Sequence, residues 1–248
     1  MHRMTTWLLG LSLLASPGWA KRPPPPAFQL GFQQFHQHHW VEALRLADQA
    51  LTEDPKCFDA FWLKAFCQLQ LGQHSQVRQT AINCRKVAGD EGERNYADYL
   101  LAEGWTTQNP AKAQALLDES VHRSTRPWRA EAQANAAWYY VKHAQGAKAL
   151  ELIDLAIPRM SLDRVSGAYD TRGAALVMLG RYKEAWIELE KAAKLYNSPN
   201  LMFHRAQCLE GLNRPREALK LYTQSLQQGG WHEFEALARK RIRALEKS

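Results

Sequence analysis

The sequence lacks the short motifs by which common enzymes are recognised. It contains no G-x-S-x-G nucleophile elbow, no phosphate-binding P-loop, no G-x-G-x-x-G dinucleotide fingerprint and no H-E-x-x-H zinc motif. The nearest match to the zinc motif, HEFEA at residues 232–236, has no second histidine. We therefore expect a protein that is not an enzyme and that needs no cofactor and no catalytic metal.

Cysteine is also scarce, and the chain has four: Cys57, Cys67, Cys84 and Cys208. No CxxC pair and no Cys/His ligand spacing is present, which argues against structural zinc and thioredoxin-like chemistry. The histidine-rich run at residues 36–39 falls at an expected turn between helices, where solvated histidines need no metal.

Long hydrophobic runs are missing after the first twenty residues. Those residues carry Arg3, an apolar core from Trp7 to Leu14, and the small residues Gly18 and Ala20. This order is typical of a secretory signal peptide at residues 1–20 and predicts cleavage before Lys21. The alternative is an uncleaved anchor, but a spanning helix needs about 20 apolar residues. We expect an exported protein, periplasmic or secreted, without a lipid anchor because no cysteine follows the cleavage site.

The remainder of the chain divides into three predicted parts. Residues 21–26 contain four consecutive prolines, which favour a polyproline II spacer. Residues 27–230 form the body, and residues 231–248 form a last helix. Hydrophobic residues make up 46% of the chain and the mean hydropathy is −0.47, which suits a helical domain without a further membrane segment. Loss of Arg3 lowers the net charge from +7 to 31 − 25 = +6, an excess common among exported proteins.

The stretch from residue 166 to residue 200 shows how the body is organised. It predicts two antiparallel helices, at about residues 168–179 and 182–196, separated by Gly180 and ended by Pro199. Two helices approach closely only where side chains are short. Such residues stand at Gly173 on the first helix and at Ala185 and Ala192 on the second.

The same spacing recurs along the chain. A small residue on a first helix precedes its partner on the second helix by twelve positions in Gly31–Ala43, Ala65–Val77, Ala137–Ala149, Gly173–Ala185 and Ala206–Ala218, with Val77 replacing a small residue. In a sixth copy, Ala113 has either Leu101 or Ala102 as its partner. The second-helix positions 43, 77, 113, 149, 185 and 218 are spaced by 34, 36, 36, 36 and 33 residues, a period that a chance bundle would not keep.

This pattern resembles the tetratricopeptide repeat, a helix–turn–helix unit of about 34 residues, over residues 27–228. The resemblance implies an all-α fold, a right-handed α-solenoid of about six such repeats. We call the first helix of each repeat helix A and the second helix B. The last helix, with acidic residues early and basic residues late, is expected to be a C-terminal capping helix. The alternative is a basic surface for membrane headgroups or acidic partners.

Two of the cysteines fall at matching helix ends in this arrangement. Cys57 opens helix A of the second repeat, and Cys84 lies late in the antiparallel helix B. In an oxidising compartment this placement predicts a disulfide between them. Cys67 and Cys208 share one repeat position and are expected to be buried small residues.

Tetratricopeptide proteins bind partners mainly along a concave surface lined by the A helices, and the resemblance implies such a groove here. Its positions lie six and three before, and one and four after, each small helix-A residue. The count places eight aromatic residues at these positions, and we expect seven of them to line a partner-binding groove: Phe28, Phe32, Phe35, Trp62, Phe66, Trp105 and Trp138. It also places Asp170, Asn200, Phe203 and Glu210 there. A register slipped by one residue would instead put Phe28, Phe32 and Phe35 in the core.

An aromatic groove favours an apolar or extended peptide. The sequence therefore predicts an exported scaffold or adaptor of the bacterial cell envelope that binds another protein or an extended peptide, and no nucleic acid. The Lys, Asn and Arg set with which some family members clamp a carboxyl-terminal peptide is missing. Two alternatives stay open: a repeat domain that binds glycan or cell-wall polymer, and a structural subunit of a fixed envelope complex.

Overall fold

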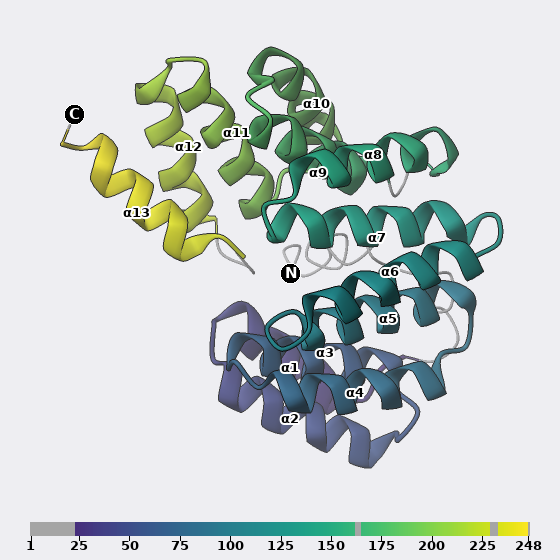
Figure 1. Cartoon of the computed structure of the whole chain (residues 1–248). Helices are drawn as coiled ribbons and strands as arrows, with labels where there is room; N and C mark the ends of the chain where they lie inside the picture. The colour runs from purple at the N-terminus through teal and green to yellow at the C-terminus, as the bar shows by residue number, and fades with distance from the viewer. Residues whose placement is uncertain (1–22, 162–164, 229–232, 248) are drawn as a thin grey trace. The chain divides into compact units, whose positions relative to one another are not determined.

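The structure, a computed structural model, describes residues 23–161, 165–228 and 233–247 (Figure 1). The predicted signal peptide lies outside these residues. Within the described residues there are thirteen α-helices, one short 3₁₀ helix and no strand. The fold is an all-α helical-repeat solenoid, as the sequence predicted. No helix in the described part of the chain is both long enough and apolar enough to cross a membrane.

The helices follow one another with short connections. Their bounds are α1 Pro26–His36, α2 Trp40–Glu53, α3 Phe58–Gln70, α4 His74–Val87, α5 Glu91–Trp105, α6 Pro110–Arg123, α7 Trp128–Lys142, α8 Gly146–Ala156, η3 Ile157–Arg159, α9 Val165–Met178, α10 Tyr182–Leu195, α11 Pro199–Gly211, α12 Pro215–Gln227 and α13 Glu235–Leu245. Odd-numbered helices from α1 to α11 are the A helices, and even-numbered helices are the B helices. The described chain divides into two compact units, an N-terminal unit ending at Ala136 and a C-terminal unit from Ala137 onward, so the boundary falls within the sequence of α7.

Five of the turns from helix A to helix B share one backbone geometry. A residue with positive φ occurs at His38, Gly72, Ala144, Gly180 and Asn213. Each lies seven positions after the small helix-A residue of its repeat. The next residue donates its N–H to a carbonyl five positions back, for example Gln73 to Gln68 at 2.8 Å and Arg181 to Leu176 at 2.9 Å. This is the Schellman motif, which satisfies the last carbonyls of helix A and reverses the chain within two residues.

The third repeat departs from this turn, yet its N-cap fixes its register. In the other five repeats the N-cap of helix B follows the small helix-A residue by eight positions: His39, Gln73, Gln145, Arg181 and Arg214. The N-cap of α6 is Asn109, whose side chain accepts the N–H of Lys112 at 3.0 Å. Counting back eight positions gives Leu101, so Leu101 rather than Ala102 takes the place of the small residue.

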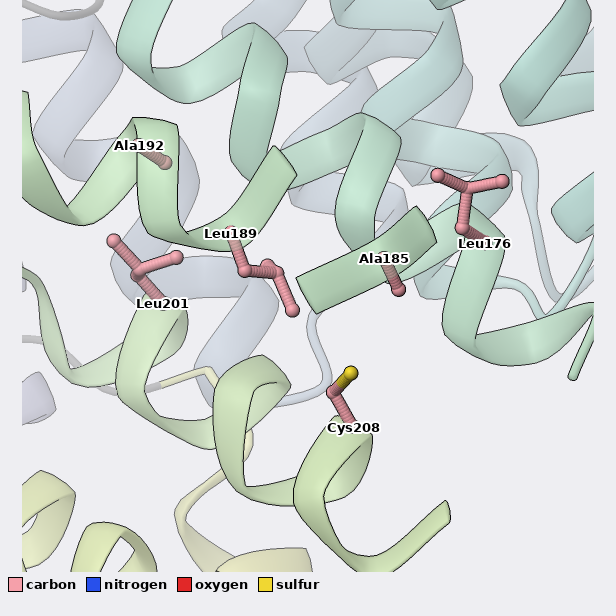
Figure 2. Close-up of a cluster of buried hydrophobic side chains, with 6 residues drawn as sticks. All are labelled: Leu176, Ala185, Leu189, Ala192, Leu201 and Cys208. Atoms are coloured by element: carbon pink, nitrogen blue, oxygen red, sulfur yellow. The ribbon is translucent and has the colours of Figure 1, made fainter. Parts of the chain in front are cut away.

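The helices of each pair touch at their small residues. All six helix-B positions of the repeat, from Ala43 to Ala218, are fully buried. Figure 2 shows one such region of the C-terminal unit, where Ala185 and Leu189 of α10 lie between Leu176 of α9 and the α11 residues Leu201 and Cys208. A Cβ at Gly173 would lie 2.5 Å from the Leu189 side chain, so the approach of α9 to α10 requires glycine there.

Aromatic side chains form the core of the N-terminal unit between α1, α3 and α5. Phe35 lies 5.9 Å from Trp62 and 6.3 Å from Phe66, measured between ring centroids. The indole Nε1 of Trp62 donates a hydrogen bond of 3.0 Å to the hydroxyl of Tyr96. Trp62 and Tyr96 are both buried, so the rings join three successive A helices into one packed layer.

The last helix, α13, packs against α12 at the C-terminal end (Figure 1). Ala238 is fully buried there, and Phe234, Ile242 and Leu245 contact the same core, which includes Phe203 and Tyr222. This packing covers the outer face of the last repeat, as a capping helix does.

A matched pair of glycine substitutions in α9 tests the close approach. A Cβ at Gly167 meets nothing within 4 Å, whereas a Cβ at Gly173 meets Leu189. Alanine has a higher helix propensity than glycine at both positions. The difference in stability between the two variants therefore measures the cost of the added methyl group against Leu189. We expect Gly173→Ala to be less stable than Gly167→Ala by about 1–3 kcal/mol in urea melts. Equal stabilities would contradict the contact at Gly173.

A second prediction concerns the aromatic core. We expect Trp62→Ala to lower the free energy of unfolding of the N-terminal unit by about 3–5 kcal/mol, because a buried ring is lost and the Tyr96 hydroxyl loses its donor. Trp105→Ala is the control, since it removes the same side chain from a partly exposed position in the same unit. Small and equal losses in denaturant melts of the two variants would show that Trp62 is not a core residue.

Candidate functional site

The seven aromatic residues predicted to line a groove have three different fates. Phe28, Phe35, Trp62 and Phe66 are buried, so the expectation that they stand exposed on a concave surface is wrong. The physical reason is the close spacing of α1, α3 and α5, which lets rings on neighbouring A helices fill the space between them. Phe32, Trp105 and Trp138 keep part of their surface exposed.

Phe32 lies at the margin of the aromatic core. Its ring centroid is 5.9 Å from that of Phe28, 6.1 Å from Trp62 and 4.3 Å from His36. Burial lowers the pKa of His36 to about 4, with a further contribution from His38. His36 is therefore neutral near pH 7 and packs as an aromatic ring, not as a cation.

Trp105 does not join the other rings. It is the last residue of α5, and its ring lies 4.4 Å from the Arg78 guanidinium of α4 and 3.8 Å from the Lys112 ammonium of α6. Both cations belong to B helices, so Trp105 packs against the helix-B layer. Two cation–π contacts account for its position.

Trp138 belongs to a different surface, formed by the A helices of the C-terminal unit. Its ring centroid on α7 lies 5.9 Å from that of His204 on α11. His204 Nδ1 lies 2.8 Å from a carboxylate oxygen of Asp170 on α9. Phe203 of α11 is adjacent, with its ring 5.6 Å from that of His204. We call this set, with Asn200 and Lys142, the helix-A face.

The segment just before α13 occupies the helix-A face. The ring of Phe234 stacks on Phe203 with centroids 4.8 Å apart and planes 9° apart. It meets the rings of His204 and Trp138 edge-on, at 5.0 Å and 6.0 Å. Phe234 is thus held in a slot of three aromatic rings contributed by α7 and α11.

Polar contacts hold Glu233, the residue before that ring. Its carboxylate lies 2.6 Å from the ammonium of Lys142, and both side chains are largely buried, at 9% and 15% exposed. Its backbone N–H donates to the side-chain carbonyl of Asn200 at 2.8 Å. The helix-A face therefore offers a cation for a carboxylate, an amide oxygen for a peptide N–H and an aromatic slot for a ring.

Sequence reasoning found part of this surface. The stripe count included Trp138, Asp170, Asn200 and Phe203, but it missed Lys142 and His204. A usable signal for His204 existed, since it follows Asp170 by 34 residues, one repeat period. No local signal marks Glu233 and Phe234, because their contacts cross from the end of the chain to α7 and α11.

The four cysteines are free thiols, and all are buried. The structure therefore does not contain the disulfide predicted between Cys57 and Cys84. Burial raises the pKa of Cys57 to about 11, and it raises the pKa of Cys84 well above its ordinary value, with further contributions from Glu93 and Asp59. The thiolate is the form that exchanges into disulfides, so both groups are held in the unreactive form.

Comparison with known proteins identifies the fold. No protein-family model matches the sequence, and no curated protein matches it. Among solved structures, the chain is similar to a tetratricopeptide repeat protein from Parabacteroides merdae, with a TM-score of 0.62 and 16% identity over 92% of this chain and 88% of that one. It is similar to a thermophilic TPR protein of Thermus thermophilus, with a TM-score of 0.50 and 21% identity over 90% and 98%. It is also similar to yeast Tom70, with a TM-score of 0.58 and 17% identity over 96% and 47%. These identities are low, and what the chain shares with the three proteins is the tetratricopeptide-like helical-repeat fold.

Proposed function

We propose that this protein is a non-enzymatic interaction scaffold that binds a peptide segment of another protein on the helix-A face of its C-terminal unit. The observation that supports the proposal is the seating of Glu233 and Phe234, because a carboxylate and an aromatic ring of the chain itself are held on this face. A ring in an aromatic slot and a desolvated charge pair are the contacts that dominate protein interfaces. The tetratricopeptide-like fold supports the proposal, since such repeats serve as binding surfaces.

The one catalytic-looking pair on this face supports binding rather than catalysis. His204 and Asp170 are joined at 2.8 Å, the geometry of an oriented general base. However, His204 is only 1% exposed, and the rings of Phe203, Trp138 and Phe234 lie around it. While Phe234 is in place the ring nitrogens of His204 are closed to solvent, and the pair ties α11 to α9.

We further propose that the protein acts in the bacterial cell envelope. The support is the sequence of residues 1–20, with its basic start, apolar core and small residues before Lys21. An exported scaffold meets partners only after its leader is removed, so the mature chain would begin with the proline-rich spacer.

The binding proposal can be tested with peptides selected from a random display library against the full chain. We expect Trp138→Ala to weaken the selected peptides at least about 30-fold, or 2 kcal/mol, measured by fluorescence anisotropy, because a hot-spot ring is lost. Trp186→Ala is the control. Trp186 is a partly buried tryptophan of the same unit, on the B helix α10, near Arg205 and Arg214.

Circular dichroism melts of both variants separate lost binding from lost folding. Selective weakening by Trp138→Ala supports the helix-A face as the binding surface. Peptides that bind wild type and Trp138→Ala equally well would overturn it.

Export is tested by expressing the full gene in a bacterial host and analysing the periplasmic fraction. We expect a mature protein whose N-terminal residue is Lys21, identified by mass spectrometry of the intact chain. Ala20→Leu is the matched variant, because a bulky residue at the cleavage site blocks processing. Protein that keeps its first twenty residues and stays in the cytoplasm would contradict the proposal.

A further inference from the structure

The helix-A face is filled by the protein itself. Glu233 and Phe234 are not part of a repeat; they lead into α13. They nevertheless contact five residues of the helix-A face: Lys142, Trp138, Asn200, Phe203 and His204. A partner peptide that needs these groups cannot bind while the segment is in place. The segment therefore has the position of a ligand.

The helix that follows buries little apolar surface. Of the α13 residues, Ala238 is buried, Ile242 and Leu245 are half-buried, and Leu237 is 42% exposed. An ion pair joins Arg241 to Glu210 of α11, and the Arg241 side chain is 44% exposed. An element with little buried surface opens at a lower free-energy cost than a helix inside the array, so α13 is the helix that can open to release the segment.

The ion pair between Lys142 and Glu233 determines what can take the place of the segment. Removing one partner of a largely buried ion pair is strongly destabilising, so loss of the Glu233 carboxylate opposite Lys142 costs more than loss of an exposed pair. A competitor must therefore return a carboxylate to Lys142 as well as a ring to the slot. Since Glu233 and Phe234 are consecutive, the competitor needs an acidic residue directly before an aromatic one.

We propose that the Glu233–Phe234 segment is a built-in occupant of the helix-A face, and that partner peptides with an acidic residue directly before an aromatic residue displace it together with α13. This inference rests on the proposed function, because it names the chemistry of the partner and the step that precedes its binding. The apparent dissociation constant of a partner is its intrinsic value divided by the fraction of protein in which the face is open.

The experiment measures binding of a fluorescent peptide, EFEALARKRIRALEK, with the sequence of residues 233–247, to the full chain. Wild type is expected to bind weakly, since its own segment competes. Phe234→Ala should bind at least about 10-fold more tightly, because the slot is empty. The same peptide with alanine in place of phenylalanine should bind neither protein. Leu237→Ala, which changes an exposed residue of α13, is the matched control and should behave as wild type.

A charge reversal gives a second test that does not depend on the stability of one variant. In the Phe234→Ala chain, Lys142→Glu should reject the EF peptide and accept a peptide that begins KF. Trypsin digestion reports release, since α13 carries Arg239, Lys240 and Arg243 in exposed positions. Cleavage there should accelerate in Phe234→Ala relative to wild type.

The outcomes separate this inference from the proposed function. Equal affinity of the EF peptide for wild type and Phe234→Ala, or no preference switch with Lys142→Glu, would overturn the built-in occupant. If library peptides still depend on Trp138 in that case, the proposed function stands. The remaining outcome is tight binding of the EF peptide only to Phe234→Ala, with no library peptide that depends on Trp138. The segment would then occupy the face only to stabilise the fold, and the proposed function would be overturned.

Discussion

The close approach of helix A to helix B within each repeat is the constraint on which the remainder of the structure depends. The backbones meet where one helix contributes glycine or alanine and the other contributes a residue that is fully buried, as Gly173 and Ala185 do. Each pair leaves an apolar face that only the next pair can cover, so burial spreads from repeat to repeat. The requirement for a small residue on helix A is not absolute. Leu101, a larger residue, stands at that position in the third repeat, where α5 and α6 join without a left-handed turn.

The two units use their A helices in different ways. In the N-terminal unit, rings from α1, α3 and α5 pack on one another, and a hydrogen bond pairs the indole N–H of Trp62 with the hydroxyl of Tyr96 inside this layer. In the C-terminal unit, the A helices present rings together with polar groups such as Asn200 and Lys142. The first arrangement packs rings against rings, and the second holds the carboxylate of Glu233 and the ring of Phe234.

A buried polar contact sets the face of the C-terminal unit apart from the aromatic core of the N-terminal unit. A largely buried ion pair such as Lys142–Glu233 contributes little net stability, since desolvation offsets attraction, but a wrong or missing partner is costly. Phe234 adds buried apolar area but does little to select one ring over another, since any aromatic ring would fill much of the slot. In the binding mode proposed above, the ion pair and the ring together would let a surface on a common fold select a particular sequence.

The sequence alone determined the repeat period, the pairing of helices and the positions of most turns, because these follow from residues within about 34 positions of each other. The spacing of small residues predicted the contact between helices A and B at Gly173 and Ala185. Only the tertiary structure decided which aromatic rings are exposed. A stripe count gives the direction of Trp62 or Phe66 around its helix, but their burial depends on the distance between neighbouring A helices. The tertiary structure also decided that Glu233 reaches Lys142, 91 positions earlier in the chain. Such a contact has no local signature, because it depends on the accumulated geometry of several repeats and not on any one of them.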